Sequence, residues 1–274
     1  MNQEQFPDFA NINRELWNEK TETHWGSEFY GVKEFLNHKN SLKPIELNLL
    51  GDFSEKSVLH LQCHFGMDTL SLAHLGAEVT GVDLSDRSIE KARELANMAG
   101  LDAEFICSNV YDLSKVLNKK YDIVFTSYGV IGWLPDMDKW AEVVSHFLKP
   151  KGEFIMAEFH PVVWMFDYDF EKVEYAYFNR DTIVEELEGT YADPTAPIKK
   201  KSVSWNHDLG EVLGALLKQG LSIKSFEEFD YSPFNCFNGT EEISEGNFII
   251  KKHGNKLPLV YALKAKKDET KIGG

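Results

Sequence analysis

The chain has 274 residues and a formal net charge of −15, from 44 Asp+Glu against 29 Lys+Arg. Its composition, 43% hydrophobic and 13% aromatic, is typical of a folded globular protein and too apolar for a disordered one. Because an acidic protein repels nucleic-acid phosphates, this balance argues against DNA or RNA as a partner and favours a small-molecule or protein partner.

Cysteine usage and hydropathy predict a cytoplasmic protein. Cys63, Cys107 and Cys236 are too few, and odd in number, for a disulfide framework, which favours a reducing compartment. Met1–Gln5 lacks the features of a signal peptide. The longest uncharged stretch, 123–135, is shorter than the ~18 apolar residues of a membrane helix. We expect no membrane association, and the oligomeric state stays open between monomer and homodimer.

Strand and helix patterns alternate from residue 57 onward. Short apolar runs predict strands at 58–61, 77–82, 103–107, 121–126 and 153–159. Helical spacing predicts helices at 66–75 and 85–99 and around Trp140, and Ser85 and Gly100 have the residue types that cap and end a helix. Strict alternation implies right-handed crossovers and a parallel sheet covered on both faces.

The pattern breaks after residue 159, which predicts an insertion. Residues 160–204 are aromatic, acidic and without a clear period; we call this segment the lid. A helix resumes at Asp208, and strands are expected at 221–229 and 257–265. The predicted organisation is a helical cap (1–50), an α/β core (51–159 and 205–266), the lid (160–204) and a flexible tail (267–274).

The negative charge is concentrated in one region. Residues 151–200 carry 11 acidic and 5 basic side chains, whereas 251–274 carry 2 acidic and 7 basic ones. Since the acidic region includes most of the lid, its carboxylates face either a bound acceptor or the solvent.

Two strand-end loops predict a nucleoside-type pocket. Open parallel sheets bind ligands beyond the carboxyl ends of their strands. The loop from Leu61 to Gly66 leads into a helix whose N-terminal amides favour an anionic group. Asp83 ends the second strand, where its carboxylate can accept hydrogen bonds from a ribose diol. Dinucleotide dehydrogenases and other Rossmann-like enzymes share this arrangement.

Five short segments follow one another in a specific order. They are His60-Leu61-Gln62-Cys63-His64-Phe65-Gly66, Gly81-Val82-Asp83-Leu84-Ser85, Asn109-Val110, Tyr121-Asp122-Ile123-Val124-Phe125 and Leu148-Lys149-Pro150-Lys151-Gly152. This ordered set resembles the motifs of class I S-adenosylmethionine-dependent methyltransferases. The resemblance implies an α/β, Rossmann-like fold with a seven-stranded, mostly parallel sheet, an antiparallel last strand and helices on both faces. It also implies S-adenosylmethionine as the cofactor.

The resemblance assigns roles to individual residues. Asp83 would bind the ribose hydroxyls, Leu84 would pack on the adenine, and Asn109 and Val110 would contact the adenine amino group and ring. Ser127 and Tyr128 follow the strand beside which the family places the reacting methyl. The expected cofactor-binding residues are Leu61, Gln62, Cys63, His64, Gly66, Asp83, Leu84, Asn109, Val110, Ser127 and, from the N-terminal cap, Tyr30.

The first segment departs from the family pattern. His60 stands where the family has an acid, and Gln62 and His64 replace two of three glycines. Glycine there permits positive φ and close approach of the ligand. The pocket is therefore either remodelled or unable to hold the cofactor. The absence of G-x-G-x-x-G weakens a nicotinamide-dependent oxidoreductase, which ranks third.

Histidines supply the candidates for metal binding and proton transfer. His60, Cys63 and His64 match no common zinc spacing, so we expect no metal. His160 ends the fifth predicted strand, and its ordinary pKa of ~6.5 suits a general base. A structural histidine before Pro161 is the alternative. Tyr128 is the second candidate catalytic residue.

The leading hypothesis is a methyltransferase that aligns a small-molecule acceptor for in-line methyl transfer. The alternative is a non-catalytic, Rossmann-like binding or regulatory protein with a remodelled cofactor loop.

Overall fold

The computed structural model describes residues 8–269 and places a seven-stranded sheet at its centre, in the order β3-β2-β1-β4-β5-β11-β8. The strands are β1 (Ser57–Leu61), β2 (Glu78–Asp83), β3 (Glu104–Cys107), β4 (Tyr121–Ser127), β5 (Leu148–Phe159), β8 (Leu221–Phe229) and β11 (Val260–Lys267). β11 runs antiparallel to both its neighbours, and the first five strands pair in parallel. The predicted Rossmann-like α/β sheet with an antiparallel last strand is confirmed.

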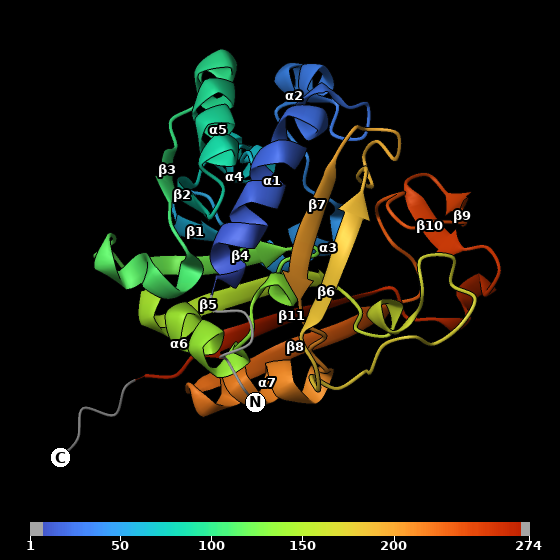
Figure 1. Ribbon diagram of the computed structural model, residues 1–274. Helices are drawn as coiled ribbons and strands as arrows, with labels where there is room; N and C mark the ends of the chain where they lie inside the picture. The colour runs from blue at the N-terminus through green and yellow to red at the C-terminus, as the bar shows by residue number, and fades with distance from the viewer. Residues whose placement is uncertain (1–7, 270–274) are drawn as a thin grey trace.

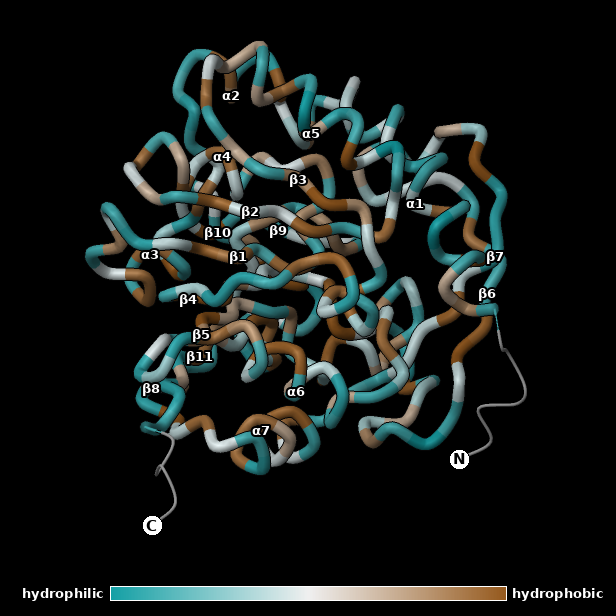
Figure 2. Tube along the Cα trace, turned by 90° about the vertical axis from the view of Figure 1, so that its left-hand side faces the viewer, coloured by the Kyte–Doolittle hydropathy of each residue, from teal (hydrophilic) through white to brown (hydrophobic). Residues whose placement is uncertain are grey.

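Helices cover both faces of this sheet (Figure 1). The elements α3 (Pro44–Leu50), α4 (Met67–His74) and α5 (Asp86–Ala99) lie on one side, and α6 (Met137–Phe147) and α7 (Leu209–Lys218) lie on the other. Successive residues of a strand point to opposite faces. Accordingly, Val58 of β1 packs in the core under α3 and α4, whereas Leu59 packs in the core under α6 and α7. Figure 2 shows the resulting apolar runs along the central strands.

The helix after β2 begins and ends where its sequence predicts. The Ser85 side chain accepts a hydrogen bond from the Ser88 N–H at 3.0 Å, which satisfies a free amide of the first turn of α5. Gly100 ends the helix in the left-handed conformation. This cap places the N-terminus of α5 beside Asp83, at the carboxyl edge of the sheet.

Several elements differ from expectation. β5 begins at Leu148, because Leu148 pairs with Tyr121 of β4; the register then shifts, and pairing resumes between Ile123 and Glu153. A 3₁₀ helix, η2 (Val110–Lys115), connects β3 towards β4. Two hairpins were not predicted: β6 (Ile183–Glu188) with β7 (Lys199–Ser204), and β9 (Thr240–Ser244) with β10 (Asn247–Ile250).

The cap and the lid meet over the carboxyl edge of the sheet. Two further N-terminal helices are α1 (Phe9–Gly26) and α2 (Val32–His38). In Figure 1 the β6–β7 hairpin lies beside α1, and the Asn13 side chain bonds the backbone of Val203 on β7 through both its oxygen and its nitrogen. The hairpin acids Glu186 and Glu188 are exposed and pair with Lys199, so these lid carboxylates face solvent.

Two expectations fall partly or wholly outside the described residues: the absence of a signal peptide, which rests on Met1–Gln5, and the end of the flexible tail, 270–274. Within 8–269, none of the helices combines the length and the apolar character required to cross a bilayer.

Gly66 provides a test of how tightly the loop before α4 is packed. Its φ is +78°, and a Cβ there would lie 2.6 Å from the Phe105 ring. We expect Gly66→Ala to lower the free energy of unfolding by about 3 kcal/mol, from backbone strain plus overpacking. Gly100 is the matched control, since its φ is +64° with nothing within 4 Å of the added Cβ. Gly100→Ala should cost only about 1 kcal/mol. Urea unfolding measures both, and equal losses would contradict the packing argument.

Candidate active site

The loop between β1 and α4 has an alternating left-handed backbone. Gln62, His64 and Gly66 have φ of 58°, 51° and 78°. At these three positions the family that the chain resembles has glycine. Gln62 and His64, which stand in place of two of those glycines, therefore keep the positive φ that glycine permits. A left-handed conformation costs a non-glycine residue about 1–2 kcal/mol. The Cys63 N–H donates to the Val82 carbonyl at 2.9 Å and holds the loop against β2.

Asp83 fastens this loop to the end of β2. Its Oδ2 accepts the His64 N–H and its Oδ1 accepts the Ser85 N–H, both at 2.8 Å. Burial raises the pKa of the Asp83 carboxyl to about 6, although these backbone hydrogen bonds act in the opposite direction. A carboxylate is therefore held half-buried beside the loop, at the edge where a ribose is expected.

Two other loop residues act mainly through packing. Leu61 is fully buried, and Cys63 is buried with its Sγ close to Gly81. Burial holds the pKa of the Cys63 thiol well above its usual value, so the thiol stays protonated. These residues position the loop, while Gln62 and His64 present polar side chains.

A directional chain of hydrogen bonds joins the loop to the cap and the lid. The Thr21 hydroxyl donates to the Trp17 carbonyl at 2.7 Å, so Thr21 is the acceptor at the far end of the chain. The chain therefore begins at the Thr190 hydroxyl, which donates to His24 Nε2, 3.0 Å away. His24 Nδ1–H then donates to His64 Nε2 at 2.9 Å, and His64 Nδ1–H donates to the Ser88 hydroxyl at 2.9 Å. Ser88 continues the chain to Thr21 on α1 at 2.8 Å.

Both imidazoles of this chain are neutral. Burial, reinforced by the charge of Lys20, lowers the pKa of His24 to about 3. Burial also holds the pKa of His64 well below its usual value. Because neither ring is charged, the chain links α1, the loop, α5 and the lid without adding a buried ion.

Aromatic rings surround the His64 ring. The Trp17 ring meets it edge-on at 5.3 Å, and Tyr30 approaches it at 5.4 Å. Tyr30 also stacks on His24 at 5.0 Å, and its hydroxyl bonds that of Tyr191 in the lid. The structure thus places Tyr30 against the loop, and its contact with the cofactor stays a prediction.

The expected adenine-side residues follow two adjacent strands. Asp83 of β2 pairs in register with Cys107 of β3, so Leu84 and Asn109 follow neighbouring strand ends. Asn109 Oδ1 accepts the Tyr111 N–H at 3.0 Å and starts η2, and Val110 is buried. The loops after β2 and β3 therefore lie together at the carboxyl edge.

Two carboxylates, the buried Glu46 and the half-buried Asp68, lie beside the end of β4. The Tyr128 hydroxyl donates to Glu46 Oε2 at 2.7 Å, and Ser127 donates to Asp68 at 3.1 Å. Burial, together with the nearby Asp68 charge, raises the pKa of Glu46 to about 7. Glu46 and Asp68 were not identified from the sequence, because nothing local distinguishes either one from a surface carboxylate.

His60 occupies the position of the usual acid but faces the core. It is 2% exposed, and its Nδ1 lies 2.9 Å from the Thr69 hydroxyl. Burial lowers the pKa of His60 to about 4, so the ring is neutral at pH 7. These contacts fit a hydrogen-bonded core histidine.

His160 lies at the end of β5 with protein partners on both nitrogens. Its Nδ1 accepts the Val162 N–H at 3.2 Å, and its Nε2 lies 2.9 Å from Glu228. Burial lowers the pKa of His160, and Glu228 acts in the opposite direction. The proposed role of His160 as general base stays a prediction, and this geometry leaves no ring nitrogen free for it.

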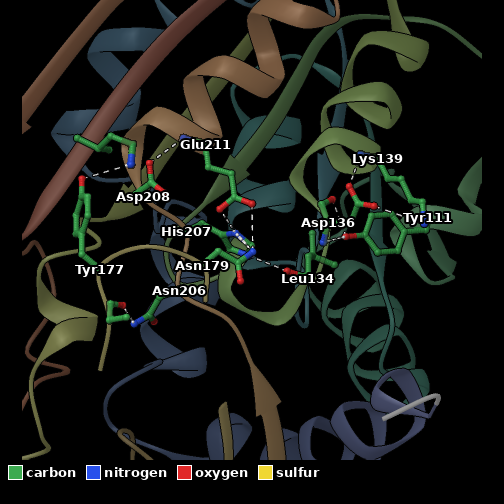
Figure 3. Close-up of polar contacts among 12 residues, drawn as sticks. Tyr111, Leu134, Asp136, Lys139, Tyr177, Asn179, Asn206, His207, Asp208 and Glu211 are labelled. Atoms are coloured by element: carbon green, nitrogen blue, oxygen red, sulfur yellow. Dashed lines mark hydrogen bonds and ion pairs between the residues drawn. The ribbon is translucent and has the colours of Figure 1, made fainter. Parts of the chain in front are cut away.

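Two neighbouring groups fix the segment after β4. The Glu158 carboxylate accepts the N–H groups of Gly129, Val130 and Ile131, so it caps the turn at 129–133. His207 ties this segment to α7: its Nε2–H donates to the Leu134 carbonyl at 2.7 Å and its Nδ1 lies 2.9 Å from Glu211 (Figure 3). Glu158 and His207 thus hold the backbone of the segment after β4 in place.

Within the described part of the chain, 8–269, no group of three or more His, Cys, Asp and Glu residues could hold a metal ion.

The α/β core is similar to known methyltransferases. A family model described as "Methyltransferase domain" matches residues 58–152. Ubiquinone biosynthesis O-methyltransferase of Serratia proteamaculans is 29% identical over 115 residues, covering 40% of this chain and 47% of the relative. That of Nitrosomonas europaea is 29% identical over 136 residues, 47% and 54% of the two chains. The chain thus spans about half the length of the curated relatives it matches.

Solved structures agree on the fold. Magnesium protoporphyrin IX methyltransferase from Synechocystis, with bound S-adenosylhomocysteine, superposes with a TM-score of 0.56 at 14% identity, covering 95% of this chain and all of the other. An S-adenosylmethionine-dependent methyltransferase from Mesorhizobium loti gives 0.54 at 19% identity, covering 82% and 96%. These matches show that the chain shares the fold of these methyltransferases, and that the family-model match lies within its α/β core.

Proposed function

We propose that the chain binds S-adenosylmethionine along the loop 62–66 and Asp83 and transfers its methyl group to a small-molecule acceptor. The observation that carries this proposal is the left-handed backbone at Gln62, His64 and Gly66 beside the Asp83 carboxylate. The non-glycine residues keep the loop in this form despite its cost, which supports retained cofactor binding over a decayed site.

The residues present fit this cofactor. Gln62 Oε1 is buried without a hydrogen-bond partner, while Gln62 Nε2 donates to the Val130 carbonyl at 2.7 Å. A buried unpaired oxygen is costly, and a donor on a ligand would satisfy it. Asp83 would bind the ribose, and Leu84, Asn109 and Val110 would surround the adenine.

The acceptor side is defined by Tyr128 and Glu46. When bound, the cofactor supplies an electrophilic methyl group on a sulfonium. For an acceptor hydroxyl, Tyr128 would take the proton at its oxygen while passing its own proton to Glu46 Oε2. The pKa of Glu46, about 7, suits this exchange at neutral pH. The relatives named as O-methyltransferases also favour an oxygen acceptor.

Cofactor binding is tested by thermal unfolding with S-adenosylhomocysteine. At 100 times Kd the ligand should stabilise the protein by about 2.7 kcal/mol, which raises Tm by roughly 5–10 °C. NADH should give no shift. Asp83→Ala should abolish the shift, whereas Asp112→Ala, an exposed acid paired with Lys115, should leave it intact.

The outcomes separate the hypotheses. No shift with S-adenosylhomocysteine for the wild-type protein would contradict the proposal. A full shift without methyl transfer to a broad panel of phenols, amines and thiols would favour the non-catalytic alternative.

The ionisation of Glu46 is tested through stability. Its folded pKa of about 7 lies above the ordinary value of 4.5, so the folded state holds the proton more tightly. Stability from this group is therefore fully present below pH 4.5 and lost as pH rises to about 7, by up to about 3 kcal/mol.

The matched variant is Glu46→Gln. As the pH rises from 5 to 7, the free energy of unfolding of Glu46→Gln should increase relative to that of the wild type. Urea unfolding at each pH measures this difference. A constant difference across this range would show that Glu46 titrates normally and is no proton acceptor near pH 7.

A further inference from the structure

Lys20 on α1 is a buried cation without an anionic partner. The residue is 5% exposed, and among residues 8–269 no carboxylate pairs with it and no acceptor bonds it. Its Nζ lies over two indole rings, 4.9 Å from the centroid of Trp17 and 5.7 Å from that of Trp133. Burial lowers the pKa of Lys20 to about 8.

A buried ammonium is costly unless an anion pairs with it, and cation–π contacts offset only part of that cost. The two nearby imidazoles, His24 and His64, are neutral and supply no negative charge. Lys91 shows the contrast: its Nζ lies 4.8 Å from the Trp25 ring centroid and also pairs with Glu94 at 3.0 Å. Lys20 lacks such an anion, which points to one supplied by a ligand.

The surroundings of Lys20 place it at the cofactor loop. Residues three and four apart share one face of a helix, so Lys20 lies on the α1 face that also carries Trp17 and His24. Trp17 contacts His64 of the loop and Trp133 after β4. The same segment after β4 receives Gln62 Nε2 through the Val130 carbonyl.

Two groups of opposite preference therefore adjoin the segment 129–133: the ammonium of Lys20, which lies over the Trp133 ring without a carboxylate partner among residues 8–269, and the buried, unpaired Oε1 of Gln62. The amino-acid end of S-adenosylmethionine has the matching pair, one carboxylate and one ammonium. Its adenosine part carries no anionic group.

We propose that Lys20 and Gln62 bind the amino-acid end of the cofactor, with Lys20 Nζ pairing with its carboxylate and Gln62 Oε1 accepting a hydrogen bond from its ammonium. This assignment rests on the proposed function. It gives Gln62 a binding role at a position where the family has glycine, and it makes α1 part of the cofactor site.

The test compares two ligands by isothermal titration calorimetry. S-adenosylhomocysteine carries the amino-acid group, whereas 5′-methylthioadenosine keeps the adenosine and the thioether but lacks it. Lys20→Met should weaken binding of S-adenosylhomocysteine by at least about tenfold, as expected for a charge-assisted contact. Its affinity for 5′-methylthioadenosine should equal that of the wild type. Gln62→Leu should show the same selective loss.

Matched variants separate charge from packing. Lys20→Arg keeps the positive charge and should retain most of the affinity for S-adenosylhomocysteine. Lys91→Met removes a lysine that also lies over a tryptophan ring and should change neither affinity. Without ligand, Lys20→Met should melt at or above the wild-type temperature, because it removes an unpaired buried charge.

Three results would overturn the assignment. Equal affinity of wild type and Lys20→Met for S-adenosylhomocysteine would exclude Lys20 while leaving the proposed function intact. Equal losses for both ligands would show that Lys20 only supports the fold. Failure of the wild type to bind either ligand would overturn both the assignment and the proposed function.

Discussion

The left-handed loop at 62–66 is the constraint on which the site depends. Two non-glycine residues adopt positive φ there, and the compensation comes from tertiary contacts. The His64 N–H bonds Asp83, and the His64 ring joins the chain of hydrogen bonds to His24 and Ser88. The side chain that makes the backbone costly is thus the one that fastens cap, lid and loop together.

The same contacts explain why the cap and the lid lie over the carboxyl edge. A glycine at position 64 could supply the backbone form but no hydrogen bond to α1. With histidine there, one chain of hydrogen bonds joins the loop to both the cap and the lid, since Thr190 of the lid and Thr21 of α1 end this chain. Tyr30 packs against the His64 ring beside it.

The acidic side chains of the lid hairpin and those near the end of β4 have different surroundings. The acidic lid posed the question of whether its carboxylates face an acceptor. In the β6–β7 hairpin Glu186 and Glu188 pair with Lys199 at the surface. The acids near the end of β4 come instead from α3 and α4, as the buried Glu46 and the half-buried Asp68. The regional excess of negative charge therefore does not identify the acceptor side.

The sequence by itself determined the α/β sheet, the capped helix at 85–99 and the position of Asp83, because periodicity and capping are local signals. It did not reveal the two hairpins, whose strands lack a clear apolar alternation, nor the buried surroundings of Lys20, His24 and Glu46. Only the tertiary structure decided these, since they depend on contacts distant in the chain: His24 meets Thr190, and Glu46 meets Tyr128. Burial turns such ordinary polar residues into site residues, and burial is a property of the whole fold.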